Sequence, residues 1–340
     1  MQEKKLKICI ISIYFGELPE WFNIWLESVK YNSKIDFLFV TDQDIITNIT
    51  NFRIIKTTFT KFKKLAQQKL NFKLKLNTPY KLCDYKEVWG IILEDEIKQY
   101  DFWGECDNDI ILGDLYHFFD LYNLSQYDKF GNRGHLTVYR NTKEVNERYK
   151  LSGGWFGTWK EVFSSNRIWG FDETPGINAI YIKYNFPYMN KFVYADIDVN
   201  YQDIRLVEFD ENSPKNFEKQ LFYWQNGKLL RSYIENNCVL EDEFMYIHLQ
   251  KRKMKKPDFD LPIGKEEKII ITNGKFVLKD GRITKESIES LNLKNNVQRF
   301  EKSFGGEYKK DLRFYWLGRR WLNIKYNTKR MLKKILMKNH

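Results

Sequence analysis

Residues 102–115 read Phe-Trp-Gly-Glu-Cys-Asp-Asn-Asp-Ile-Ile-Leu-Gly-Asp-Leu, an apolar stretch interrupted by an acidic triplet. Asp107 and Asp109 stand one residue apart where the first apolar part ends. Side chains alternate along an extended backbone, so both carboxylates point to the same side. Mg²⁺ and Mn²⁺ prefer carboxylate oxygens together with ligand phosphates. The stretch therefore predicts a site for a divalent cation and a diphosphate, with a solvated turn as the alternative.

The segments around this triplet predict an open, mostly parallel sheet, because apolar strands alternate with amphipathic helices. The expected strands cover 7–15, 35–41, 52–56 and 134–139, and the expected helices cover 19–31, 59–70, 83–99 and 142–150. Ligands of such sheets gather at the carboxyl ends of the strands. The ends of the first two strands and the Asp107 turn are therefore expected to face one crevice.

The second half of the chain is expected to be richer in antiparallel strands. Asn226-Gly227 and Asn273-Gly274 are hairpin signals flanked by strand-like residues, and Asp280-Gly281 is a third turn signal. We predict a main α/β domain over 1–255, a small hairpin-rich extension over 256–305 and a basic tail over 306–340.

Composition bears on the cellular compartment and on membrane-spanning segments. The four cysteines are far apart and show no CxxC pairing, which predicts reduced thiols in a cytosolic protein. The apolar run near the N-terminus reads as a buried strand rather than as a signal peptide. No apolar segment approaches the roughly twenty residues that cross a bilayer.

The positive charge is concentrated in the tail. Residues 308–340 hold eleven Lys or Arg and one Asp, so they carry +10 of the net charge of +11. Apolar residues such as Leu317, Trp321 and Ile324 recur there at helical spacing. This pattern predicts an interfacial helix on an anionic membrane surface. A helix packed on the protein is the alternative, and no recognised nucleic-acid-binding motif accompanies the tail.

Together, the strand-helix-strand opening, the Asp107-Asn108-Asp109 triplet and the later run Tyr246-Ile247-His248-Leu249-Gln250-Lys251-Arg252-Lys253-Met254 resemble GT-A fold glycosyltransferases. The resemblance covers roughly residues 5–255 and is strongest to bacterial enzymes of capsule, exopolysaccharide or lipopolysaccharide assembly. It implies a Rossmann-like, mostly parallel sheet flanked by helices, with a smaller antiparallel and helical C-terminal appendage. It also implies a hexosyltransferase that uses a UDP-sugar.

The resemblance assigns roles to the acidic triplet and to the later run. Asp107 is implied to face the ribose or the metal, and Asp109 to bind Mn²⁺ or Mg²⁺. His248 is the implied third metal ligand, with a satisfied core histidine as the alternative. Lys251 or Arg252 is implied to contact the diphosphate, with an ordinary basic loop as the alternative.

The resemblance also implies a nucleotide-sugar side at the ends of the first strands and at the helix before the triplet. For Asp84, an acid in the first turn of a helix is an equal alternative. The residues implied to contact the base, the ribose or the donor sugar are Tyr14, Phe15, Gly16, Asp42, Lys81 and Asp84.

On the acceptor side, Gly153-Gly154-Trp155-Phe156-Gly157 and the later Trp169-Gly170-Phe171-Asp172-Glu173 resemble segments of inverting GT-A enzymes. Asp172 or Glu173 is implied to take the proton from the acceptor hydroxyl. The alternative is that these two acids cap the helix expected over 177–183.

These features predict a metal-dependent glycosyltransferase, with a lean to inversion, that moves a sugar from a UDP-sugar to a glycan or an undecaprenyl-diphosphate-linked acceptor. The basic tail predicts a cytoplasmic enzyme held peripherally on the inner face of the plasma membrane. A nucleotidyl or phosphosugar transferase and a non-catalytic glycan-binding scaffold are the alternatives.

Overall fold

The computed structural model describes residues 6–155, 157–201, 203–250 and 252–291. Its largest sheet has seven strands in the order β3-β2-β1-β4-β7-β6-β8. The neighbours from β3 to β4 are parallel, whereas β7 runs antiparallel to β4 and to β6. The strands are β1 (Ile8–Tyr14), β2 (Asp36–Thr41), β3 (Phe52–Lys56), β4 (Phe102–Cys106), β6 (Lys129–Phe130), β7 (Leu136–Arg140) and β8 (Tyr188–Met189).

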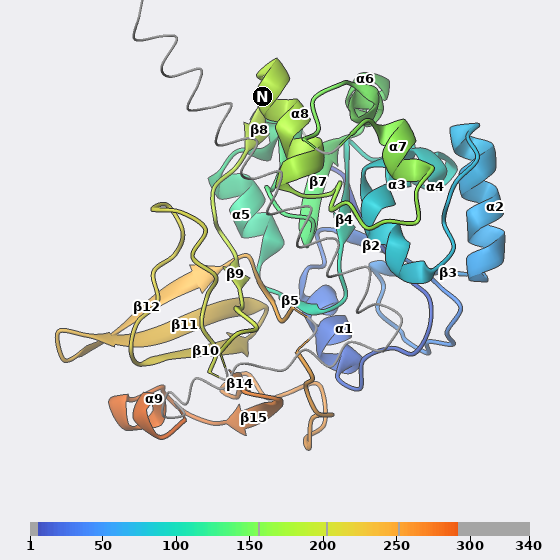
Figure 1. The fold of residues 1–340 in the computed structure, drawn as a ribbon. Helices are drawn as coiled ribbons and strands as arrows, with labels where there is room; N and C mark the ends of the chain where they lie inside the picture. Colours follow the sequence, from blue (N-terminus) through green and yellow to red (C-terminus); the bar gives the residue numbers. More distant parts are fainter. Residues whose placement is uncertain (1–5, 156, 202, 251, 292–340) are drawn as a thin grey trace, which may run out of the picture.

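Helices cover both faces of this sheet (Figure 1). Alternate residues of β1 point to opposite faces, as in any strand. Ile8 and Ile10 pack in the core that includes α1 (Phe22–Tyr31), whereas Cys9 and Ile11 pack in the core that includes α2 (Phe59–Leu70). The other α-helices are α3 (Trp89–Ile92), α4 (Glu94–Ile97), α5 (Leu115–Leu121), α6 (Lys143–Glu147), α7 (Trp159–Phe163), α8 (Ala179–Tyr184) and α9 (Lys285–Leu291).

Two smaller sheets complete the fold. A three-stranded sheet, in the order β5-β13-β9, consists of β5 (Ile110–Leu112), β9 (Ala195–Asp196) and β13 (Tyr246–His248). A five-stranded antiparallel sheet has the order β12-β11-β10-β14-β15 and lies beyond β5, with α9 beside it (Figure 1). Its strands are β10 (Gln220–Gln225), β11 (Lys228–Glu235), β12 (Cys238–Phe244), β14 (Lys268–Thr272) and β15 (Lys275–Lys279).

The predicted α/β class, with a large and mostly parallel sheet, is confirmed. The first two hairpin signals lie at the β10–β11 and β14–β15 turns. The five-stranded sheet draws strands from both sides of residue 255, and the division near that residue stays a prediction. The four cysteines are free thiols.

The helix expected over 83–99 is broken in the structure. A 3₁₀ helix covers Pro79–Val88 and is followed by the short helices α3 and α4. Gly90 lies against the Trp103 indole, and a Cβ at this position would collide with the ring. A segment whose periodicity alone favours one helix is thus divided into three short helices, and Gly90 lets α3 lie close against β4.

No helix in the described ranges is both long enough and apolar enough to span a bilayer. The tail predicted to lie on a membrane surface, 306–340, is outside the described residues.

Candidate functional site

The acidic triplet forms the turn between β4 and β5, at the carboxyl end of β4. Its backbone is held on two sides. The Asp107 N–H donates to the His135 carbonyl at 2.8 Å, and the Leu249 N–H donates to the Asp109 carbonyl at 2.9 Å. Because β1 and β4 are parallel neighbours, their carboxyl ends meet at this edge of the large sheet.

His248 reaches the triplet through strand pairing. β13 runs antiparallel to β5 with His248 opposite Ile110, which brings its ring beside Asp109. His248 Nε2 lies 3.4 Å from Asp109 Oδ1. One candidate ligand atom from each of Asp107, Asp109 and His248 falls within 4.8 Å of the other two. The structure thus brings together the three predicted metal ligands.

The other ring nitrogen of His248 is held by Asp196, the last residue of β9. Nδ1 lies 2.7 Å from Asp196 Oδ1, and the Gln250 amide donates to the same oxygen at 2.8 Å. Burial alone lowers the pKa of His248, but the charges of Asp109 and Asp196 outweigh it and raise the pKa to about 10. A carboxylate behind a histidine is the usual way to orient the ring toward a metal.

His135 and Lys86 also belong to the cluster, although no motif in the sequence marks them. The His135 ring lies over the His248 ring with 3.7 Å between centroids. Burial first, and then the neighbouring His248, hold the pKa of His135 well below its ordinary value. Lys86 is buried, and its ammonium lies 2.6 Å from Asp107, 3.4 Å from Asp172 and 3.6 Å from Glu105.

This lysine remains charged despite its burial. Desolvation lowers the pKa of Lys86, but the carboxylates of Asp107, Glu105 and Asp172 together raise it well above its ordinary value. The ammonium also donates to the Gly134 carbonyl. Lys86 therefore links the predicted metal ligand Asp107 to the predicted base Asp172.

Asp172 sits close to the backbone of Gly134, where a Cβ would collide with its carboxyl group. Burial raises the pKa of Asp172 well above its ordinary value, although the nearby Lys86 acts in the opposite direction. Glu173 is the N-cap of the π-helical turn Thr174–Asn178, but its side chain makes no capping hydrogen bond. In the described residues, the Glu173 side chain therefore does not cap the turn that follows it, contrary to the capping alternative.

Lys81 and Asp84 face the protein interior rather than a ligand. Both are buried, and their charged groups lie 2.7 Å apart. The Asp84 carboxylate accepts from the backbone N–H groups of Trp169 and Phe171 at 2.9 Å. In the structure this pair holds the loop that carries Asp172, and its expected contact with the nucleotide stays a prediction.

Of the residues predicted on the nucleotide side, some lie at the ends of β1 and β2 and one lies in the core. Gly16 has a φ of 109° and donates its N–H to Asp42 at 3.1 Å, so the ends of β1 and β2 are joined. The pKa of Tyr14 is raised by burial and then by the charge of Asp109. Phe15 instead packs on the rings of Phe59 and Phe62. Strand alternation turns Phe15 away from Tyr14 and into the core, and its expected ligand contact stays a prediction.

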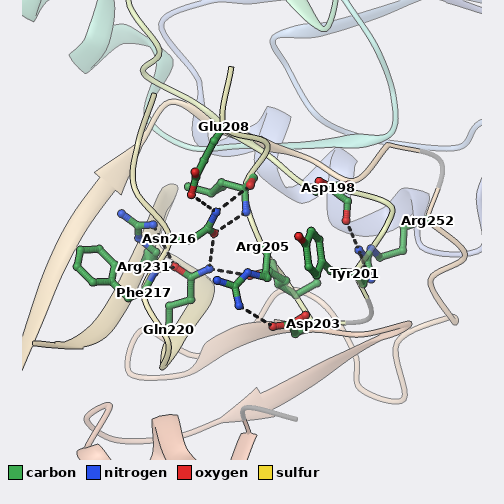
Figure 2. Close-up of polar contacts among 12 residues, drawn as sticks. Asp198, Tyr201, Asp203, Arg205, Glu208, Asn216, Phe217, Gln220, Arg231 and Arg252 are labelled. Carbon is green, nitrogen blue, oxygen red and sulfur yellow. Dashed lines mark hydrogen bonds and ion pairs between the residues drawn. The ribbon is translucent and has the colours of Figure 1, made fainter. Parts of the chain in front are cut away.

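Arg252 anchors a loop (Figure 2). Its guanidinium donates to the carbonyls of Asp198 at 3.1 Å and Tyr201 at 2.9 Å, and to Asn273 Oδ1 at 3.0 Å. In the structure the guanidinium is directed at this loop, and its expected diphosphate contact stays a prediction. Lys251 lies outside the described residues.

A family model described as a family of unknown function (DUF6625) matches residues 10–280. No curated protein matches the chain. Among solved structures, the glycosyltransferase GlyE of Streptococcus pneumoniae TIGR4 gives a TM-score of 0.32 at 11% identity, over 54% of this chain and 45% of that one. The chain thus spans less than half of GlyE.

Two further solved structures are similar at the same level. A glycosyltransferase involved in the glycosylation of the major capsid of PBCV-1 has a TM-score of 0.34 at 9% identity, over 56% of this chain and 84% of that one. The galactosyltransferase LgtC, in complex with donor and acceptor sugar analogs, has a TM-score of 0.32 at 10% identity, over 56% and 75%. At such scores, the residues of the site have to carry any functional conclusion.

Proposed function

For this chain, which belongs to the family of unknown function DUF6625, we propose the activity of a metal-dependent glycosyltransferase. The donor is a nucleotide sugar, with UDP as the nucleotide, and the acceptor is a glycan or a lipid-linked glycan. The observation that carries the proposal is the cluster of Asp107, Asp109 and His248 at the carboxyl end of β4, joined through Lys86 to the buried Asp172.

The donor atoms of the cluster fit a divalent cation. Two carboxylates and one imidazole with an oriented ring suit Mn²⁺, and Mg²⁺ with added water and phosphate ligands. Such a cation, held by Asp107, Asp109 and His248, would offset the negative charge that grows on a departing nucleoside diphosphate. The raised pKa of His248 is that of the metal-free site, and a metal at Nε2 would compete with the proton.

The remaining residues of the cluster serve the donor and the acceptor. Asp42, Gly16 and Tyr14 border the position proposed for the nucleotide. Asp172 or Glu173 is proposed to take the proton of the acceptor hydroxyl, and the raised pKa of Asp172 suits a proton acceptor. A protein base beside the acceptor is expected where the acceptor hydroxyl displaces the nucleoside diphosphate directly. This arrangement supports inversion of the anomeric configuration over retention.

The test is the release of nucleoside diphosphate from a panel of nucleotide sugars, with Mn²⁺ or with EDTA. Metal-dependent release from one donor is expected. Release of pyrophosphate or nucleoside monophosphate would instead support the nucleotidyl or phosphosugar transferase. If no donor is turned over and none raises the melting temperature in the presence of metal, the scaffold alternative is favoured and the proposal fails.

Substitutions at Asp196 and Gln250 test the metal site by changing the support of the His248 ring to different extents. Asp196→Asn removes the charge behind His248, so it is expected to weaken Mn²⁺ binding by about 10–100-fold. Binding is measured by electron paramagnetic resonance in the presence of UDP. Gln250→Ala removes only the second hydrogen bond to Asp196 and should have the smaller effect. Equal Mn²⁺ affinity in wild type and Asp196→Asn would contradict the assignment.

We also propose that the enzyme works at the inner face of a bacterial plasma membrane, in capsule, exopolysaccharide or lipopolysaccharide synthesis. The support is the charge of residues 308–340, which hold eleven Lys or Arg and one Asp. The full chain is expected to co-sediment with phosphatidylglycerol vesicles and to be released by high salt. Equal sedimentation with phosphatidylcholine vesicles would argue against an electrostatic contact.

A further inference from the structure

A cleft of about 690 Å³ opens beside the candidate site, next to β8 and the segments 190–193 and 209–212. Four aromatic rings contribute to its lining: those of Tyr122, Tyr188, Phe192 and Phe209. A cavity of this volume is in the range of small-ligand sites. Aromatic rings offer apolar faces on which the C–H faces of a sugar ring can pack.

Amide groups supply the polar part of the lining. Asn132 is fixed in the wall, because it donates to the Asn190 carbonyl at 2.6 Å and accepts from the Tyr194 hydroxyl at 2.7 Å. The side chains of Asn190 and Asn212 are exposed at the cleft, and in the described part of the chain neither makes a hydrogen bond. A side-chain amide both donates and accepts, which matches the hydroxyl groups of a sugar.

The charged residues of the cleft are Arg133, Lys191 and Asp210. The Arg133 guanidinium lies 3.8 Å from the centre of the Phe209 ring and donates to the Thr174 hydroxyl at 2.9 Å. Lys191 lies 5.0 Å from the centre of the Tyr122 ring. Asp210 adds an opposing negative charge to the lining. Both cations lie against rings, and Asp210 offsets one of them, so the three charged residues of the lining sum to +1.

The cleft shares its wall with the candidate site. Arg133 is followed by Gly134, which lies against Asp172, and by His135, which lies over His248. Thr174, on the other side of the Arg133 guanidinium, stands two residues beyond Asp172. A ligand in the cleft would therefore lie next to the loop that carries the proposed base.

We propose that this cleft binds uncharged sugar units of the acceptor, and that Asn190, Asn212 and Phe192 select them. This assignment rests on the proposed transferase function and adds the acceptor site to it. The nucleotide binds elsewhere, at the edge formed by β1, β2 and β4.

The test fills the cleft from its exposed rim in the full-length protein. Asn212→Trp places a bulky ring in the cleft, and Glu211→Trp is the matched control, because Glu211 is exposed and does not line the cleft. Saturation-transfer-difference NMR with lactose, cellobiose and N-acetyllactosamine measures sugar binding. Asn212→Trp is expected to weaken binding by at least about tenfold, and Glu211→Trp to leave it unchanged.

A second variant tests whether Asn212→Trp acts only by altering the segment 209–212. Phe192→Leu keeps most of the apolar volume but removes the ring, and it should also lower saturation transfer. Wild-type binding in both Asn212→Trp and Phe192→Leu would overturn the assignment, as would the absence of binding by any of the three sugars to the wild type.

Nucleoside-diphosphate release by the same variants separates the two proposals. The cleft lies outside the donor site, so Asn212→Trp should retain metal-dependent release from the donor. If Asn212→Trp retains both nucleoside-diphosphate release and sugar binding, the proposed acceptor cleft is wrong, while the proposed transferase activity stands. Sugar binding by a wild type that turns over no donor overturns the transferase, and with it the acceptor role of the cleft.

Discussion

Replacing Asp109 with alanine is expected to lower metal-dependent nucleoside-diphosphate release by at least about a hundredfold. Asp109 is one of the three residues whose ligand atoms gather within 4.8 Å. A bound cation stabilises developing negative charge by several kcal/mol, and each 1.36 kcal/mol changes the rate about tenfold. Release is measured with the donor identified from the panel, at saturating Mn²⁺.

The matched control is Asp120→Ala, which removes an exposed carboxylate from the end of α5, away from the cluster. It should leave release unchanged. Mn²⁺ binding in the presence of UDP provides a second readout, which Asp109→Ala should weaken in parallel with activity. Full activity of Asp109→Ala in a correctly folded protein would exclude the proposed metal site.

Replacing Lys86 with methionine is expected to lower the free energy of unfolding by about 3–5 kcal/mol, because it leaves buried carboxylates without their counter-charge. Lys86 is the cation that Asp107 and Asp172 share. Urea unfolding followed by circular dichroism gives the free energy. Lys86→Arg, which keeps the charge, should recover part of the loss.

The loss of stability in Lys86→Met should also depend on pH. The pKa of Asp172 is already raised in the folded protein, mainly by burial, and removing the lysine raises it further. Above the ordinary pKa near 3.8, the folded state then holds a proton that the unfolded chain releases, so stability falls as the pH rises. The deficit of Lys86→Met relative to wild type should therefore be larger at alkaline pH.

Lys64→Met is the control for this variant, because Lys64 is an exposed residue of α2. It is expected to change the free energy of unfolding by less than about 0.5 kcal/mol at any pH. A loss in Lys86→Met no larger than that of Lys64→Met would show that Lys86 does not balance the buried acids.

Sequence periodicity was sufficient for the elements up to residue 70, because β1 and β2 are continuous buried apolar runs and α2 buries one face. The expected ranges 52–56 and 59–70 coincide with β3 and α2, and the strands over 7–15 and 35–41 differ from β1 and β2 only at their ends. The single helix expected over 83–99 is instead three short helices, and buried contacts of Asp84 with the backbone of Trp169 and Phe171 hold its first part.

For the site, local sequence was enough to place the Asp107 and Asp109 carboxylates on one side of the chain, since strand alternation is a local property. Of the distant groups that join them, the resemblance implied His248, whereas Asp196 and Lys86 are identified by the folded structure. Strand pairing brought His248 beside Asp109 and Asp196 behind His248, from positions far apart in the chain. Lys86 acquired its role because three separate carboxylates converge on one buried ammonium. No local pattern encodes such a convergence, because it depends on the packing of several elements together.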